Sequence, residues 1–130
     1  MIVDSSAVVA IVNGEPDAQA FADAIEQSES VSISAVTLLE TCIKLDAQSS
    51  RNISRRLDRL IAAAQLDVID VTVDQVAIGR EAYAEFGKGS GHPARLNFGD
   101  CFSYALAFAT GEPLLYKGND FSQTDLKSAI

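Results

Sequence analysis

Short apolar segments alternate with helical patterns along the whole 130-residue chain, and this alternation limits the possible folds more than any other feature. The apolar segments predict strands at residues 1–4, 31–33, 66–71 and 114–116. The helical patterns predict helices at residues 5–12, 16–27, 35–48, 52–65, 73–86 and 98–110. Such alternation is typical of a parallel sheet with helices on both faces. We therefore expect an α/β fold of three layers, with a mainly parallel central sheet of four to five strands.

The pattern of residues 35–48 also predicts which face of that helix is buried. Ser34 is a typical N-cap residue, and Val36, Leu39 and Ile43 follow it at helical spacing. We expect these three side chains to face the core.

Composition limits the class of protein. A chain of 130 residues fits one domain, here residues 1–130, and no apolar run reaches the roughly 18 residues that span a bilayer. The amino terminus lacks the basic flank and apolar core of a signal peptide, so we expect a cytoplasmic protein with no membrane contact. The formal net charge of −8 disfavours binding to nucleic acid by bulk electrostatics alone.

Acidic residues lie where an open α/β sheet places its functional site, at the carboxyl ends of its strands. Asp4 directly follows the first predicted strand, and Asn119 and Asp120 follow the fourth. Each residue also has a simple structural explanation. Asp4 could cap the next helix, and Gly118, Asn119 and Asp120 together are common turn residues.

Asp100 stands in the first turn of a largely apolar helix within LNFGDCFSYALAFATG, residues 96–111. With Asn97 as cap, its carboxylate can reach back to the cap and is stabilised by the helix dipole. On a helical projection Asp100 shares a narrow polar face with Ser103, Tyr104 and Ala107. We expect Asp100 to face a small pocket rather than open water.

Glu40 lies at the border of the apolar stripe of helix 35–48, where a solvent-exposed glutamate is an equally good explanation. Together with Asp4, Asp100 and Asp120, it would supply the oxygen ligands that Mg²⁺ or Mn²⁺ requires. A divalent cation would also offset the repulsion among these acids.

Four segments in order carry a resemblance that covers nearly the whole chain: MIVDSSAVVAIVNGEP, SAVTLLE, LNFGDCFSYALA and PLLYKGNDF. Together they resemble the PIN-domain ribonucleases and, more narrowly, the VapC-type toxins of bacterial toxin–antitoxin pairs. The resemblance implies a PIN-like fold and a metal-dependent endoribonuclease whose acidic centre is Asp4, Glu40 and Asp100. It also implies that Ser6 supports this centre, and that Asp120, or Asn119 in its place, is the fourth site residue.

The resemblance further implies an RNA substrate, a VapB-type antitoxin that blocks the acidic site, and a homodimer. An acidic enzyme needs local cations to hold phosphate. Lys88 and Arg95 in the glycine-rich loop 87–97, and Lys117 near the predicted site, are candidates for substrate binding. A second candidate is the arginine cluster of helix 52–65 and the residue before it, which comprises Arg51, Arg55, Arg56 and Arg59.

Two other classes are compatible with an acidic α/β domain of this length. A receiver domain would need adjacent acids after the first strand, and Ser5 and Ser6 follow Asp4 instead. A non-catalytic binding module of the same fold would keep its function when Asp4 or Asp100 is replaced.

Overall fold

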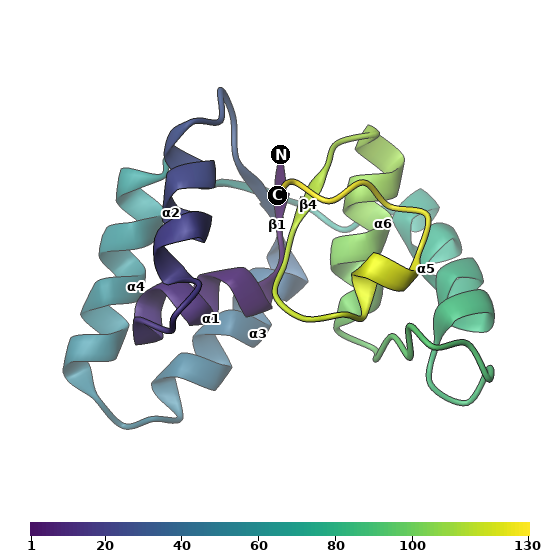
Figure 1. The fold of residues 1–130 in the computed structure, drawn as a ribbon, viewed down its shortest axis with the longest axis horizontal. Coiled ribbons are helices and arrows are strands. Elements are labelled where there is room, and N and C mark those ends of the chain that lie inside the picture. Colours follow the sequence, from purple (N-terminus) through teal and green to yellow (C-terminus); the bar gives the residue numbers. More distant parts are fainter.

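The computed structural model describes all 130 residues and has the expected α/β architecture (Figure 1). Its sheet contains β1 (Ile2–Val3), β2 (Ser32–Ser34), β3 (Asp67–Ile69) and β4 (Leu114–Leu115), all parallel, in the order β3-β2-β1-β4. The helices are α1 (Ser5–Asn13), α2 (Ala18–Glu26), α3 (Ala35–Asp46), α4 (Arg51–Ala63), α5 (Val73–Phe86) and α6 (Asp100–Thr110). Four strands and six helices agree with the fold predicted from the sequence.

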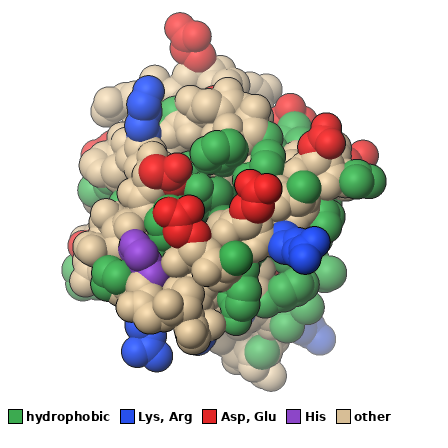
Figure 2. All heavy atoms as spheres, turned by 90° about the vertical axis from the view of Figure 1, so that its right-hand side faces the viewer, with side chains coloured by type: hydrophobic (Ala, Val, Ile, Leu, Met, Phe, Trp, Pro, Cys, Tyr) green, Lys and Arg blue, Asp and Glu red, His purple; other side chains and the backbone are tan.

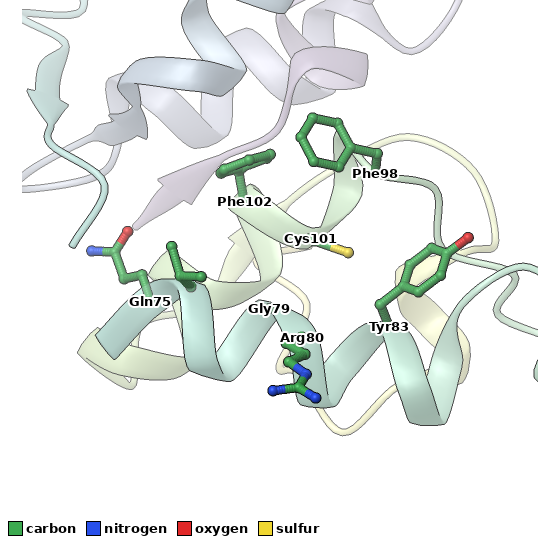
Figure 3. A pocket seen from close by; sticks show the side chains of 8 residues that line it. Gln75, Gly79, Arg80, Tyr83, Phe98, Cys101 and Phe102 are labelled. Carbon is green, nitrogen blue, oxygen red and sulfur yellow. The ribbon is translucent and has the colours of Figure 1, made fainter. Parts of the chain in front are cut away.

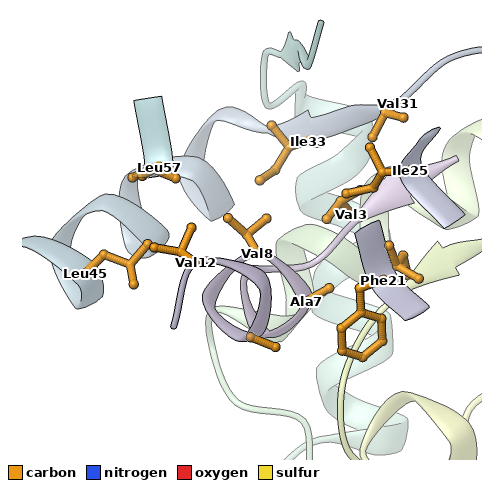
Figure 4. Packing of buried hydrophobic residues seen from close by; sticks show 12 residues of the cluster. Val3, Ala7, Val8, Val12, Phe21, Ile25, Val31, Ile33, Leu45 and Leu57 are labelled. Atoms are coloured by element: carbon orange, nitrogen blue, oxygen red, sulfur yellow. The ribbon is translucent and has the colours of Figure 1, made fainter. Parts of the chain in front are cut away.

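The central strands are buried on both faces, which produces three layers. Successive side chains of a strand point to opposite faces, so Ile2 and Leu114 pack against α5 and α6, whereas Val3 and Leu115 pack against the helices of the other layer. Figure 4 shows the cluster that contains Val3, in which residues of α1, α2, α3 and α4 pack against one face of the sheet. Figure 1 shows α1, α2 and α4 on one side of the sheet and α5 and α6 on the other.

The predicted buried face of α3 is wrong. Leu39 and Ile43 are 59% and 61% exposed. The buried positions of this helix are Thr37, Thr41 and Leu45. Threonine can replace an aliphatic residue here because its hydroxyl is satisfied: Thr41 Oγ1 donates to the carbonyl oxygen of Thr37 at 2.7 Å. An apolar stripe of α3 is left facing outward.

The carboxyl-terminal tail differs from a regular fifth strand. Following Gly118 it forms a 3₁₀-helix, η1 (Phe121–Gln123), and then meets the sheet in a single parallel bridge between Leu114 and Ser128. The sheet therefore has four strands.

The strand order locates the edge of the sheet where a site can form. From β1 the chain proceeds to β2 and β3 on one side, and β4 then pairs with the other side of β1. Ligands of open α/β sheets bind at the carboxyl ends of strands where the order reverses in this way. Asp4 follows β1 at that point, and the segment before η1 follows β4. None of the helices combines the length and the hydropathy needed to cross a bilayer.

Candidate active site at the carboxyl edge of the sheet

Asp4 is buried at the junction of β1 and α1, where it is the N-cap residue of α1 and one of the four predicted site acids. Its Oδ2 accepts hydrogen bonds from the backbone N–H of Ser6 at 2.9 Å and from Ser6 Oγ at 2.7 Å. Its Oδ1 accepts a third bond, 2.6 Å long, from Ser103 Oγ of α6. Capping and site geometry therefore coexist, and three donors fix the orientation of the carboxylate.

Ser6 connects Asp4 to the segment that follows β4. The backbone N–H of Lys117 donates to Ser6 Oγ at 2.9 Å. Since that N–H occupies an acceptor position of the hydroxyl, the Ser6 proton remains available for Asp4. This arrangement agrees with the supporting role expected of Ser6.

Asp100 and Asn97 form the reciprocal cap that the sequence predicts. Asp100 Oδ2 accepts from the backbone N–H of Asn97 at 2.7 Å, and Asn97 Oδ1 accepts from the backbone N–H of Asp100 at 3.0 Å. Asp100 is the first residue of α6 and is partly buried. The cap satisfies one carboxylate oxygen of Asp100 and leaves the other without a hydrogen bond inside the protein.

The pKa of the Asp100 carboxyl is raised to about 6, chiefly because burial removes it from water. The bond from the Asn97 N–H opposes this shift. The negative charges of Asp4, Asp120 and Glu40, in that order, raise the pKa further. The other three predicted acids therefore all lie close enough to influence the carboxyl group of Asp100.

Glu40 reaches the start of α6 from α3. A Cβ atom added to Gly99 would lie 2.7 Å from Glu40 Oε2, so the carboxylate rests directly against the residue before Asp100. Its other oxygen, Oε1, is 2.8 Å from Lys44 Nζ, one turn further along α3. The side chain is neither free in solvent nor part of the core.

Asp120 and Asn119 are exposed in the turn before η1. The Asp120 carboxylate makes no capping hydrogen bond to η1, and its charge acts on Asp100. Asp120 is thus better supported than Asn119 as the fourth site residue, and its role stays a prediction.

The predicted substrate-binding cations differ in their surroundings. Lys117 Nζ lies 2.5 Å from Glu15 and 3.3 Å from Asp17, and these partners raise the pKa of its ammonium group. Lys88 and Arg95 are exposed in loop 87–97. On the face formed by this loop, α5 and the tail, the basic side chains stand apart from one another and form no continuous strip (Figure 2). The arginine cluster belongs to α4, in the opposite layer.

Sequence reasoning missed two hydroxyl groups of the site. Ser103 lies one turn after Asp100, and Thr37 lies three residues before Glu40. Ser103 appeared only as part of the polar face of its helix, and Thr37 had no role. The available signal was a serine within a largely apolar helix. Its partner Asp4, however, is 99 residues away in the sequence.

The family model of the PIN domain matches residues 1–127. The chain belongs to the PIN-domain family. Within it, ribonuclease VapC28 of Mycobacterium tuberculosis is 53% identical over 130 residues, covering 100% of this chain and 98% of that protein. Ribonuclease VapC42 of the same organism is 48% identical over 129 residues, covering 99% and 98% of the two chains.

A solved structure supports the same fold. The crystal structure of M. tuberculosis VapC20, described as a toxin that cleaves the sarcin–ricin loop, superposes with a TM-score of 0.74 at 19% identity, over 96% of this chain and 95% of that one. The family model and the two relatives confirm the resemblance to PIN-domain, VapC-type ribonucleases and exclude a receiver domain.

Proposed function

We propose that this protein is a metal-dependent endoribonuclease, the toxin of a VapBC-type pair, that hydrolyses RNA phosphodiesters at the carboxyl edge of its sheet. The observation that carries the proposal is the convergence of charge on Asp100. Asp4, Glu40 and Asp120, from three separate segments, all raise its pKa. A VapC-family chain that gathers four acids without enough nearby cations to neutralise them is suited to bind a divalent ion.

The donor set fits a hydrated Mg²⁺ or Mn²⁺. No three His, Cys, Asp or Glu side chains converge tightly enough to enclose an ion among themselves. Mg²⁺ keeps several of its waters, however, and is commonly held by only one or two carboxylates together with substrate phosphate. Asp4 Oδ1 and the unbonded oxygen of Asp100 suit this role best, with Glu40 and Asp120 acting through water.

When bound, the ion would activate water for attack and stabilise charge on the phosphate. The chain itself supplies orientation. Asp4 is held rigidly by Ser6 and Ser103, and the Asn97 N–H holds one oxygen of Asp100 while the other stays available to the ion. Lys88 and Arg95 are free to contact the RNA backbone, and Lys117 would have to leave its acidic partners first.

We also propose a homodimer that forms through an apolar face shared by α3, α5 and α6. A groove of about 360 Å³ lies between α5 and α6, with Tyr83, Phe98 and Phe102 around it (Figure 3). Phe98 is 74% exposed, and Leu39 on the outward stripe of α3 is 59% exposed. A second copy would cover apolar surface that water otherwise contacts.

We further propose that the VapB-type antitoxin places a basic side chain among the acids.

The test is cleavage of RNA by purified, antitoxin-free protein. Total cellular RNA is incubated with wild type or Asp100→Asn in Mg²⁺, Mn²⁺ or EDTA, and new 5′ ends are mapped. We expect discrete cuts that require a divalent ion and disappear in the variant. If wild-type protein leaves RNA intact in both metals and binds neither by calorimetry, the non-catalytic binding module is the correct alternative.

A further inference from the structure

A chain of buried hydroxyl groups runs from α3 through α6 to Asp4. Ser103 is 0% exposed, and its Oγ lies 2.6 Å from Asp4 Oδ1. The same Oγ lies 3.1 Å from Oγ1 of Thr37, which is 1% exposed. Both side chains are polar groups within the layer between the sheet and two helices, and the only charged group they reach is Asp4.

The number of protons that each group can donate determines which hydroxyl donates to which in this series of hydrogen bonds. An ionised carboxylate only accepts, so Ser103 must donate its single proton to Asp4. Ser103 can then only accept from Thr37, and Thr37 must be the donor of that pair. Ser103 Oγ is the one hydrogen-bond partner of the Thr37 hydroxyl, and the neighbouring Thr41 hydroxyl donates its own proton to the Thr37 carbonyl oxygen.

We propose that Ser103, oriented by Thr37, is a positioning residue that holds Asp4 Oδ1 in the direction required for ion binding. This inference rests on the proposed function. Both Ser6 donors bond to Oδ2, so without Ser103 no group holds Oδ1 directly and the carboxylate plane can tilt within the freedom that the two Ser6 bonds leave. Hydrogen bonds that orient carboxylate ligands in this way typically contribute about 10- to 100-fold to metal affinity or activity.

Ser34 offers a matched control on the same face of the sheet. Ile2 pairs with Ser32, so Ser34 lies alongside Asp4 in the register of β1 and β2. Ser34 is 1% exposed, and its Oγ has no hydrogen-bond partner. Ser34→Ala therefore removes the same atom as Ser103→Ala, from an equally buried site, without breaking a bond to Asp4.

The experiment measures the Mn²⁺ concentration for half-saturation by calorimetry and for half-maximal RNA cleavage. For Ser103→Ala we expect both concentrations to rise about 10-fold or more. Ser34→Ala should match wild type. Thr37→Val keeps the side-chain volume but loses the donor and should shift in the same direction as Ser103→Ala. Thr37→Ser loses a methyl group but keeps the donor and should stay near wild type, which a purely structural role would not produce.

The outcomes separate this inference from the function on which it rests. Asp4→Asn is the reference, and its melting curve and that of each variant are recorded in EDTA. If Asp4→Asn abolishes binding and cleavage while Ser103→Ala behaves like Ser34→Ala, the positioning role is overturned and the nuclease stands. If Asp4→Asn retains both properties, the proposed function fails and this inference fails with it. Should Ser103→Ala not fold, equal Mn²⁺ requirements of the two Thr37 variants overturn the positioning role.

Discussion

The Asp100 carboxyl is subject to opposing influences at the start of α6. Burial and three neighbouring acids favour its protonated form, whereas the Asn97 N–H favours the charged form. The net result is a pKa of about 6, above the ordinary value of 3.8. At neutral pH the native state thus holds a charge that its surroundings oppose, which is the condition a bound cation relieves.

Replacing Asp100 by Asn should stabilise the protein in EDTA at pH 7. The unfolded chain loses the Asp100 proton near pH 4 and the folded chain only near pH 6, so stability falls as pH rises through this window. Allowing for partial exposure of the carboxyl, the cost at pH 7 is about 1 to 2 kcal/mol. Asn removes this cost and keeps an acceptor for the Asn97 N–H.

Thermal melting from pH 3.5 to 7.5 checks this expectation. The variant should melt about 4 to 8 °C above wild type at pH 7, and the two curves should converge below about pH 4. Adding Mg²⁺ should raise the melting temperature of wild type and leave that of the variant unchanged. A wild type that is the more stable of the two in EDTA at pH 7 would argue against a cluster of repelling acids.

Ser34→Ala should also stabilise the protein. A buried hydroxyl without a partner carries a desolvation cost that no hydrogen bond offsets, and Ser34 Oγ is in this position. We expect an increase of about 0.5 to 1 kcal/mol in the free energy of unfolding. Urea denaturation measures it, and a loss of 1 kcal/mol or more would show that the hydroxyl has a partner in solution.

The start of α6 depends on a glycine because α3 approaches it closely. Gly99 has helical backbone angles that alanine adopts easily, yet a Cβ atom there would lie 2.7 to 3.0 Å from the Glu40 carboxylate atoms. Gly99→Ala should therefore maintain or slightly raise stability while displacing Glu40 from Asp100.

A loss of RNA cleavage without a loss of thermal stability would identify the displacement of Glu40. We expect RNA cleavage by Gly99→Ala at subsaturating Mg²⁺ to fall several-fold, with no decrease in melting temperature. Gly111→Ala, at the opposite end of the same helix, has positive φ and should lose stability without changing the Mg²⁺ requirement. Unchanged cleavage by Gly99→Ala would indicate that Glu40 is not needed where the structure places it.

The outward apolar face of α3, α5 and α6 leads to a prediction about assembly. Phe98→Asp places a charge in the groove and should weaken self-association at least 10-fold, measured by sedimentation velocity across a concentration series. Phe108→Asp is the control, because Phe108 is 51% exposed on α6, the helix that Phe98 precedes, but does not line the groove. Equal association of both variants, or a monomeric wild type, would refute this interface.

Local patterns were sufficient to predict the elements and to select acids that the fold brings together, and insufficient for features that depend on distant partners. Strand ends and helix starts are local signals, and the structure places Asp4 and Asp100, selected from them, close enough for their charges to interact. The buried face of α3 was not, because Thr37 is buried through a bond to Ser103, 66 residues away. Likewise, the pairing of Lys117 with Glu15 spans 102 residues.

Across the whole molecule, sheet order and charge act together. The reversal of strand order at β1 brings the carboxyl ends of β1 and β4 to the same edge of the sheet, and α3 and α6 contribute Glu40 and Asp100 near it. The chain as a whole carries a charge of −8, which repels RNA at long range. Binding of divalent cations would therefore assist substrate approach as well as chemistry.

The proposed metal-dependent site is tested most directly by measuring bound ions and RNA cleavage in one titration. Wild-type protein is stripped with EDTA, transferred to metal-free buffer and titrated with Mn²⁺, while bound Mn²⁺ is followed by electron paramagnetic resonance and RNA cleavage is sampled from the same tube. We predict that the two curves rise together and that Asp100→Asn shows neither. Cleavage that persists without bound Mn²⁺, or tight Mn²⁺ binding that Asp100→Asn leaves intact, would contradict the proposed site.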